Sequence, residues 1–182
     1  MKKAAILGAT LGCLALAGQF ALAANLYSIS FDDGKSFNTT LTRATDDQGP
    51  YVLGVITTKK DEVFAGTGSF KLDSLASEEE WNEMYWSDWK VIKFAPSTTY
   101  TIDFDYKILD YQDNYFYFLM RSYEGRPGGP DRGWTTWTPD NGETGHQTVT
   151  FELDDFADYY INIGNHFKGS QVIDNIVVRV GE

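Results

Sequence analysis

The stretch YTIDFDYKI, residues 100–108, alternates apolar and polar side chains without interruption. Because successive side chains of a β-strand point to opposite faces, this pattern predicts a strand with one face in a core and the other toward solvent. The apolar face carries Tyr100, Ile102, Phe104, Tyr106 and Ile108. No comparably long helical period occurs in the sequence, so the chain is predicted to be built from strands.

The same alternation extends in both directions from this stretch. It recurs at 115–121, 148–153 and 159–163, while 171–180 is more continuously apolar and weaker strand patterns lie at 25–31, 37–43, 51–58, 69–73 and 85–94. Segments rich in Gly, Pro and Asp separate these runs, as turns require. About ten short strands with such spacing predict an all-β fold, a two-sheet antiparallel β-sandwich of the jelly-roll, galactose-binding-domain-like kind.

The first residues have the pattern of a secretory signal peptide. Lys2 and Lys3 precede an apolar run over 4–22, which closes with the small-residue site Ala21-Leu22-Ala23. We therefore expect a signal peptide over 1–23, cleaved after Ala23 or Ala24, one β-sandwich domain over 24–182, and a secreted or periplasmic location. A retained membrane anchor and a lipoprotein modified at Cys13 are the alternatives, although Thr10 replaces the Leu that a lipobox requires.

Charge and cysteine content limit the partners of the exported chain. The formal net charge is −11, and loss of a leader with two lysines and no acid would make it −13. A chain this acidic is expected to bind neither nucleic acid nor, once the signal is removed, a membrane. Cys13 is the single cysteine and lies in the predicted leader, so no disulfide can secure the termini.

Four motifs, read in order, carry a resemblance to a known family. They are SFDDG at 30–34, GTGSFKL at 66–72, FAPSTTYTIDFDYKIL at 94–109 and VIDNIVV at 172–178. Together they resemble the cellulose- and xylan-binding modules of the galactose-binding-like jelly-roll type that are appended to bacterial glycoside hydrolases. The resemblance implies a non-catalytic module that binds a polysaccharide or oligosaccharide. Because this sequence shows neither a catalytic domain nor a linker, a glycoside hydrolase would be a partner in trans.

The resemblance also implies a structural calcium ion. Carried over residue by residue, its ligands would be the carboxylates of Asp32 and Asp174 and the backbone carbonyls of Ser69 and Lys71. Ca²⁺ prefers such hard oxygens, and Asp174 stands inside an apolar strand where an unpaired carboxylate would be costly. The alternative is an ordinary turn aspartate at Asp32 and a strand-edge aspartate at Asp174.

The polar face of the alternating strands is the expected ligand site. If the strands are neighbours, one outward face collects aromatic rings for stacking on sugars, together with groups that hydrogen-bond to hydroxyls. The two rings of WTTW at 134–137 should face opposite ways because their separation is odd. The alternative is a solvated face on which tyrosines only fill strand positions. The candidate ligand-binding residues are Tyr115, Tyr117, Arg121, Asp103, Asp105, Tyr160, Asn162, Trp86 and Trp134.

Catalysis is not indicated by any motif. The acids occur in runs such as 78–80 and 152–155, which usually face solvent, and His146 and His166 lack metal-site spacing. Two other classes of function stay open. One is a surface or matrix protein whose aromatic face binds protein, and the other is a small jelly-roll hydrolase or lyase with an acid pair in the same groove.

Overall fold

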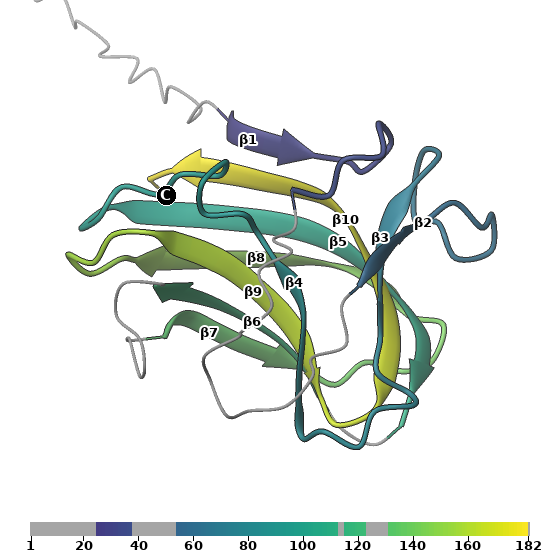
Figure 1. Ribbon diagram of the computed structural model, residues 1–182. Coiled ribbons are helices and arrows are strands. Elements are labelled where there is room, and N and C mark those ends of the chain that lie inside the picture. The colour runs from purple at the N-terminus through teal and green to yellow at the C-terminus, as the bar shows by residue number, and fades with distance from the viewer. Residues whose placement is uncertain (1–24, 38–53, 113–114, 123–130, 182) are drawn as a thin grey trace, which may run out of the picture.

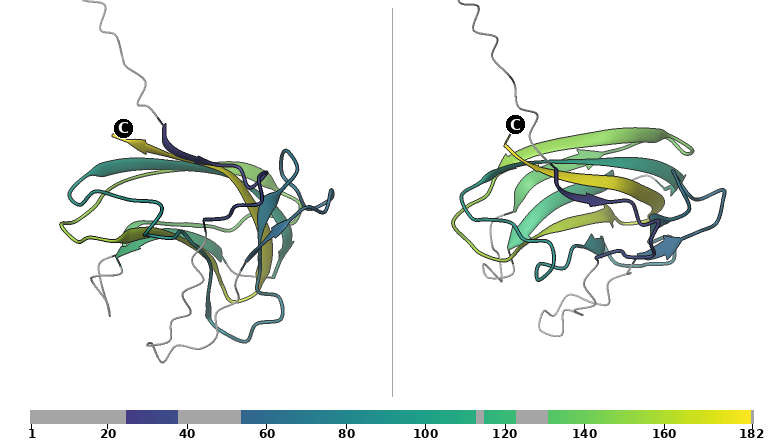
Figure 2. Two further views of the ribbon diagram at one scale, coloured as in Figure 1. Left: turned by 45° about the horizontal axis from the view of Figure 1, so that its top comes forward. Right: turned by 90° about the horizontal axis from the view of Figure 1, so that it is seen from above.

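The computed structural model describes residues 25–37, 54–112, 115–122 and 131–181. Its strands stack as two curved layers, seen edge-on in Figure 1 and from two further directions in Figure 2. The predicted all-β, two-sheet antiparallel sandwich is confirmed. The strands are β1 Asn25–Ile29, β2 Val55–Thr57, β3 Ser69–Asp73, β4 Trp81–Trp86, β5 Thr99–Tyr111, β6 Tyr115–Ser122, β7 Arg132–Trp137, β8 Thr144–Glu152, β9 Tyr159–His166 and β10 Gly169–Val180.

The larger sheet has six strands in the order β2-β3-β10-β5-β8, with β1 also paired to β10, and the smaller one has the order β4-β9-β6-β7. The core lies between them and is made by the apolar halves of the alternating strands. The rings of Phe104 on β5 and Phe118 on β6 stack across the layers with centroids 5.9 Å apart. The outward halves of the two sheets therefore face away from each other, on opposite sides of the molecule.

Strand β10 holds the larger sheet together by pairing with three other strands. Residues Ser170–Ile173 pair with β3 and Ile176–Arg179 pair with β1, while the other edge of β10 pairs with β5 throughout. The register against β5 shifts between Asp174 and Val177, and Asn175 there has a φ of 49°. A bulge of this kind increases the local twist. It falls at the point where β10 changes partners from β3 to β1.

Two predicted strands differ from the structure. The pattern at 85–94 predicted a strand, but β4 ends at Trp86 and the chain turns, with the Val91 and Ile92 amides donating to the Asp88 carbonyl. The predicted strand at 37–43 and the predicted signal peptide at 1–23 lie outside the described residues, except for Phe37. In the described part of the chain, no helix has the length and hydrophobicity that a membrane span requires.

Candidate functional site

The outward face of the smaller sheet carries a cluster of aromatic rings contributed by all of its strands. Strand register places Trp81 of β4 beside His166 of β9, and His166 beside Tyr115 of β6. Tyr117 follows two residues along β6, and Trp134 comes from β7, on the other side of β6. These five residues, Trp81, Tyr115, Tyr117, Trp134 and His166, are called the aromatic cluster below.

Two parallel stacks and one crossing ring make up the aromatic cluster. Tyr117 stacks on Trp134 with centroids 5.5 Å apart and an interplanar angle of 14°, and Tyr115 stacks on His166 at 4.6 Å and 2°. Trp81 meets the other four rings at 62° to 66°, with centroids 4.3–6.3 Å away. Edge-to-face and offset contacts of this kind are favourable beyond simple burial. The cluster is therefore a preformed array, in which each ring is oriented by its neighbours.

The two indoles of the aromatic cluster remain open to solvent. Trp81 is 40% exposed and Trp134 is 46% exposed, whereas Tyr117 is only 1% exposed. Large exposed aromatic side chains are unusual on a strand that also packs a core, and contiguous ones commonly mark binding surfaces. The predicted opposition within WTTW is confirmed, because Trp137 lies in the core while Trp134 faces outward.

A glycine creates the space that the aromatic cluster needs. Gly164 of β9 pairs with both Glu83 and Tyr117, in the middle of the sheet. A Cβ built on Gly164 would lie 2.4 Å from the Tyr117 hydroxyl oxygen and 2.2 Å from the Asn82 carbonyl oxygen. Tyr117 therefore extends over a position where any other residue would displace it.

Arg121 lies farther along the same face, held between two carboxylates. Its Nη1 pairs with Glu83 of β4, and its Nε donates to Asp131 Oδ1 at 3.0 Å. Burial acts to lower the pKa of the guanidinium, but the charges of Glu83 and Asp131 outweigh it and raise that pKa. Arg121 is thus a charged group of fixed orientation at the end of the aromatic cluster.

The remaining predicted residues of this face, Trp86, Tyr160 and Asn162, are present on it but buried. Tyr160 pairs with Arg121 in the strand register, and Asn162 pairs with Trp86 on one side and Leu119 on the other. The rings of Trp86 and Tyr160 lie 5.8 Å apart. The structure thus brings together Tyr115, Tyr117, Arg121, Tyr160, Asn162, Trp86 and Trp134, as the sequence predicted.

The prediction that Asp103 and Asp105 share this face is wrong. Both lie on β5, which belongs to the six-stranded sheet, so they face the opposite side of the sandwich from β6. The period-two pattern identified both strands but does not say which strands are hydrogen-bonded neighbours. On the far side the two carboxylates are paired within their own sheet, through Thr148 and Arg179 for Asp103 and through His146 and Asn175 for Asp105.

Two residues of the aromatic cluster, Trp81 and His166, were not among the predicted ligand-binding residues. Trp81 was missed because the predicted strand began at residue 85, although Trp81 and Glu83 continue the outward alternation. A register shift between Glu83 and Tyr85 interrupts that pattern. His166 was missed because the predicted strand ended at residue 163, whereas β9 extends to His166. Tyr160, Asn162, Gly164 and His166 form one outward row of that strand.

The predicted calcium ligands gather, in part, around the loop before β3. The Asp32 carboxylate accepts hydrogen bonds from the Thr67 amide at 2.6 Å and the Gly68 amide at 3.0 Å. The Asp174 carboxylate accepts one from the Ser69 hydroxyl at 2.7 Å. Burial raises the pKa of Asp174, and the charge of Asp32 adds to the rise. Two carboxylates from opposite ends of the chain thus lie close enough to interact.

The oxygen atoms of this donor set are of the hard kind that Ca²⁺ prefers. Asp32 and Asp174 supply carboxylate oxygens, and a cation between them would stabilise the charged form of Asp174, which burial and then the charge of Asp32 disfavour. Lys71 lies two residues beyond Ser69 on β3, and its ammonium points away to Glu62 at 3.0 Å and Asp73 at 3.4 Å. Among the described residues, no group of three or more His, Cys, Asp or Glu side chains is arranged to hold a metal.

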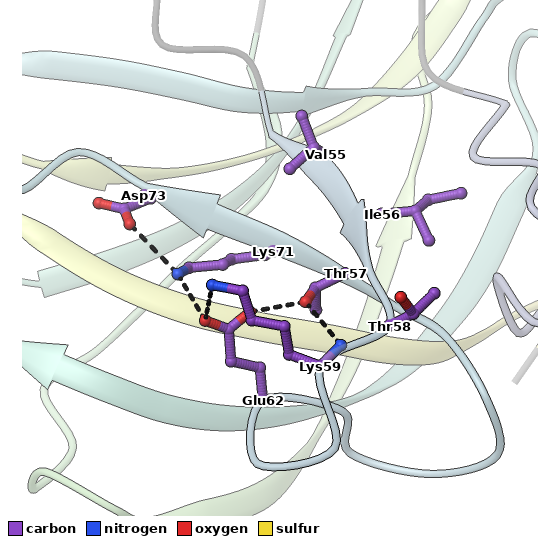
Figure 3. Close-up of a pocket in the computed structure, with 8 residues that line it drawn as sticks. All are labelled: Val55, Ile56, Thr57, Thr58, Lys59, Glu62, Lys71 and Asp73. Carbon is purple, nitrogen blue, oxygen red and sulfur yellow. Dashed lines mark hydrogen bonds and ion pairs between the residues drawn. The ribbon is translucent and has the colours of Figure 1, made fainter.

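A hollow of about 380 Å³ lies on the larger sheet, beside β2 and β3 (Figure 3). Most of its polar groups are hydrogen-bonded or ion-paired to one another, as the dashed lines in Figure 3 show. Glu62 is the centre of this network, with Thr57 donating to it at 2.6 Å and Lys59 and Lys71 paired to it. The hydrogen bond from Thr57, helped by the two lysines, lowers the pKa of Glu62 to about 2. The network ties the β2–β3 loop to the sheet.

Comparisons with known proteins agree with the fold. No protein-family model matches the sequence, and no curated protein is similar to it. Among solved structures, the CBM22-1-GH10 modules of Clostridium thermocellum xylanase 10B, complexed with xylohexaose, match with a TM-score of 0.61 and 12% identity. That match covers 88% of this chain, which spans only 29% of the xylanase chain.

Two structures of single domains are similar over almost their whole length. The CBM22-1 xylan-binding domain of Paenibacillus barcinonensis Xyn10C matches with a TM-score of 0.56 and 14% identity, over 87% of this chain and 95% of that one. The K1 cleaved adhesin domain of the Lys-gingipain of Porphyromonas gingivalis matches with a TM-score of 0.58 and 12% identity, over 86% and 98%. The chain thus has the jelly-roll fold of carbohydrate-binding modules, as its sequence motifs indicated.

Proposed function

We propose that this protein is a non-catalytic carbohydrate-binding module that holds a β-linked polysaccharide of the xylan or cellulose type on the outward face of its smaller sheet. The observation that carries the proposal is the pair of exposed indoles, Trp81 and Trp134, supported from below by Tyr117 and from the side by Tyr115 and His166. The structural likeness to xylan-binding domains supports this assignment.

The chemistry of the face suits a sugar chain. Pyranose rings present patches of C–H groups that lie on aromatic faces, and their hydroxyls need donors and acceptors of fixed direction. The indoles supply the first, and Arg121, oriented by Glu83 and Asp131, supplies donors at the end of the array. Rings that are already oriented lose little side-chain entropy when a ligand binds, which favours affinity.

The proposal includes the predicted export and a structural calcium ion. Asp32 and Asp174 would supply carboxylates, and Ser69 and Lys71 their carbonyl oxygens, to a cation that links the N-terminal segment with the last strand. The role of such an ion would be structural, because Ser69, Lys71 and Asp174 lie on the larger sheet, with Asp32 in the turn after its strand β1, and the aromatic cluster lies on the smaller one. Outside the cell the module would act beside a glycoside hydrolase supplied in trans.

Affinity electrophoresis tests the proposal. The wild type is run through gels containing soluble xylan, hydroxyethyl cellulose, mixed-linkage glucan or galactomannan, and we expect retardation by xylan or hydroxyethyl cellulose. Trp134→Ala should reduce the retardation at least about tenfold, because stacking on an aromatic ring contributes on the order of 1–1.5 kcal/mol beyond the area it buries. Trp89→Ala is the matched control, since that indole lies in the turn after β4, near Lys90 and Lys93.

The outcomes separate the candidate functions. Retardation by none of the four polysaccharides would overturn the proposal and leave a protein-binding surface as the explanation of the exposed rings. Equal loss of retardation in Trp134→Ala and Trp89→Ala would contradict the assignment to this face. Release of reducing sugar from a retarding polysaccharide would show a hydrolase instead of a module without catalysis.

A further inference from the structure

One polar side chain on the outward face of the smaller sheet is left without the hydrogen bonds that its burial requires. Asn162 is 0% exposed, and neither its Nδ2 nor its Oδ1 has a hydrogen-bond partner among the described residues. A buried amide that loses its bonds to water without replacement lowers the stability of the folded state. Proteins satisfy nearly all such groups, so an exception calls for a reason.

Another asparagine on the same strand shows how this protein satisfies a buried amide. Asn165 lies on the inward face of β9 and is 1% exposed. Its Nδ2 donates to Ser74 Oγ at 2.9 Å and to the Gly169 carbonyl at 2.7 Å, and its Oδ1 accepts from Gln171 Nε2 at 3.4 Å. The contrast between the two asparagines therefore follows the two faces of the sheet. The inward amide of Asn165 is hydrogen-bonded within the protein, and the outward amide of Asn162 is not.

The position of Asn162 connects it to the proposed ligand site. In the strand register, Asn162 pairs with Trp86 of β4 on one side and with Leu119 of β6 on the other. Its neighbours in the outward row of β9 are Tyr160 and Gly164, each two residues away. Gly164 is covered by Tyr117 of the aromatic cluster, and Tyr160 pairs with Arg121. Asn162 thus lies between the ring array and the fixed guanidinium, where a ligand that contacts both would pass.

We propose that the Asn162 side-chain amide is the hydrogen-bonding contact that this module reserves for a hydroxyl of its sugar ligand. The inference rests on the proposed function. An amide with both its donor and its acceptor unused is complementary to a group that donates and accepts at once, and a sugar hydroxyl is such a group. Because Asn162 is 0% exposed in the structure, the groups that cover it must shift when the ligand hydroxyl reaches it.

The inference makes an unusual prediction about the free protein. Leucine has nearly the size of asparagine but needs no hydrogen bonds, so Asn162→Leu should remove an energetic cost from the unliganded module. We expect its urea midpoint to equal or exceed that of the wild type. Asn165→Leu is the matched control on the same strand, and its midpoint should fall, because it removes the hydrogen bonds that the Asn165 amide makes with Ser74, the Gly169 carbonyl and Gln171.

Calorimetric titration with xylohexaose and with cellohexaose completes the test. The affinity of Asn162→Leu for the hexaose that the wild type binds should fall at least about tenfold, the loss expected when a ligand hydroxyl is left unpaired. Asn162→Ala should show the same loss, which keeps the test available if the leucine variant folds poorly.

Two results would overturn the inference while leaving the proposed function intact. One is wild-type affinity in both variants at position 162, and the other is a midpoint of Asn162→Leu that falls as far as that of Asn165→Leu. If the wild type binds neither hexaose and is retarded by none of the four polysaccharides, the proposed function fails first and the role of Asn162 fails with it.

Discussion

At Glu62 a single carboxylate organises the loop between β2 and β3. It accepts from Thr57 and is paired to Lys59 and Lys71, with its side chain only 13% exposed. Its pKa is lowered from 4.5 to about 2. A lowered carboxylate pKa stabilises the fold above the unfolded-state value and loses that contribution as the pH falls through the folded-state value. As the pH falls from 4.5 to 2, the stabilising contribution of Glu62 should therefore be lost progressively.

In Glu62→Gln we expect the free energy of unfolding to depend less on pH in the acid range than it does in the wild type. Its free energy of unfolding should be about 1–2 kcal/mol below wild type at pH 7, less than the full pKa shift implies because solvent screens the pair. The difference should shrink as the pH falls from 4.5 to 2. Urea titrations at several pH values measure both quantities, with Glu152→Gln as an exposed control. A difference that stays constant down to pH 2 would be inconsistent with this role.

Gly164 gives a second prediction at the scale of one residue. In Gly164→Ala the new Cβ would meet the Asn82 carbonyl and the Tyr117 hydroxyl well inside contact distance. Overpacking of this kind costs about 1–3 kcal/mol, so the urea midpoint should fall. Displacement of Tyr117 should also change the near-ultraviolet circular dichroism of the Tyr117–Trp134 stack. An unchanged midpoint and spectrum would mean that Tyr117 does not depend on the glycine.

At the scale of elements, the bulge at Asn175 is what lets β10 pair with β3 over one half and with β1 over the other. Asn175 adopts a φ of 49°, and its Nδ2 donates to Asp105 Oδ2 at 2.9 Å. Glycine adopts positive φ without cost, whereas a β-branched residue does not. Asn175→Val should therefore lower the free energy of unfolding by about 2–3 kcal/mol, and Asn175→Gly by clearly less. Equal losses in urea unfolding would show that the backbone conformation is not the cause.

Strands were predictable from this sequence to different degrees. The pattern that begins at Tyr100 identified β5 because its alternation is uninterrupted, and the alternation around Phe118 identified β6 in the same way. Neither pattern specified a neighbour, because a period of two describes the faces of a strand and not its hydrogen-bonded partners. For that reason Asp103 was assigned to the wrong side of the sandwich. Trp81 was missed for a local reason, the register shift that follows Glu83.

At the scale of the whole molecule, the two proposed sites lie on different sheets. The smaller sheet presents the aromatic cluster, and the larger sheet carries the loop where Asp32 and Asp174 meet. A structural cation on the larger sheet should stabilise the fold without contacting the ligand. It would do so by binding the folded state and not the unfolded chain.

If the protein binds a structural calcium ion, its melting temperature should depend on the concentration of Ca²⁺. Excess EDTA should lower the melting temperature of the wild type by several degrees, and added Ca²⁺ should restore it, since a ligand at 100 times its Kd contributes about 2.7 kcal/mol. Asp174→Asn should be insensitive to both, while retaining polysaccharide binding wherever it is folded. A wild-type melting temperature that does not change when EDTA is added would contradict the calcium proposal.

The most direct test observes the indole N–H groups by NMR while xylohexaose, and separately cellohexaose, is added to the ¹⁵N-labelled protein. We predict that the signals of Trp81 and Trp134 shift progressively with one of these sugars, while that of Trp89 stays in place. The account would be contradicted if neither exposed indole responded to either sugar, or if Trp89 alone responded, because the sheet face described above would then not be where sugar binds.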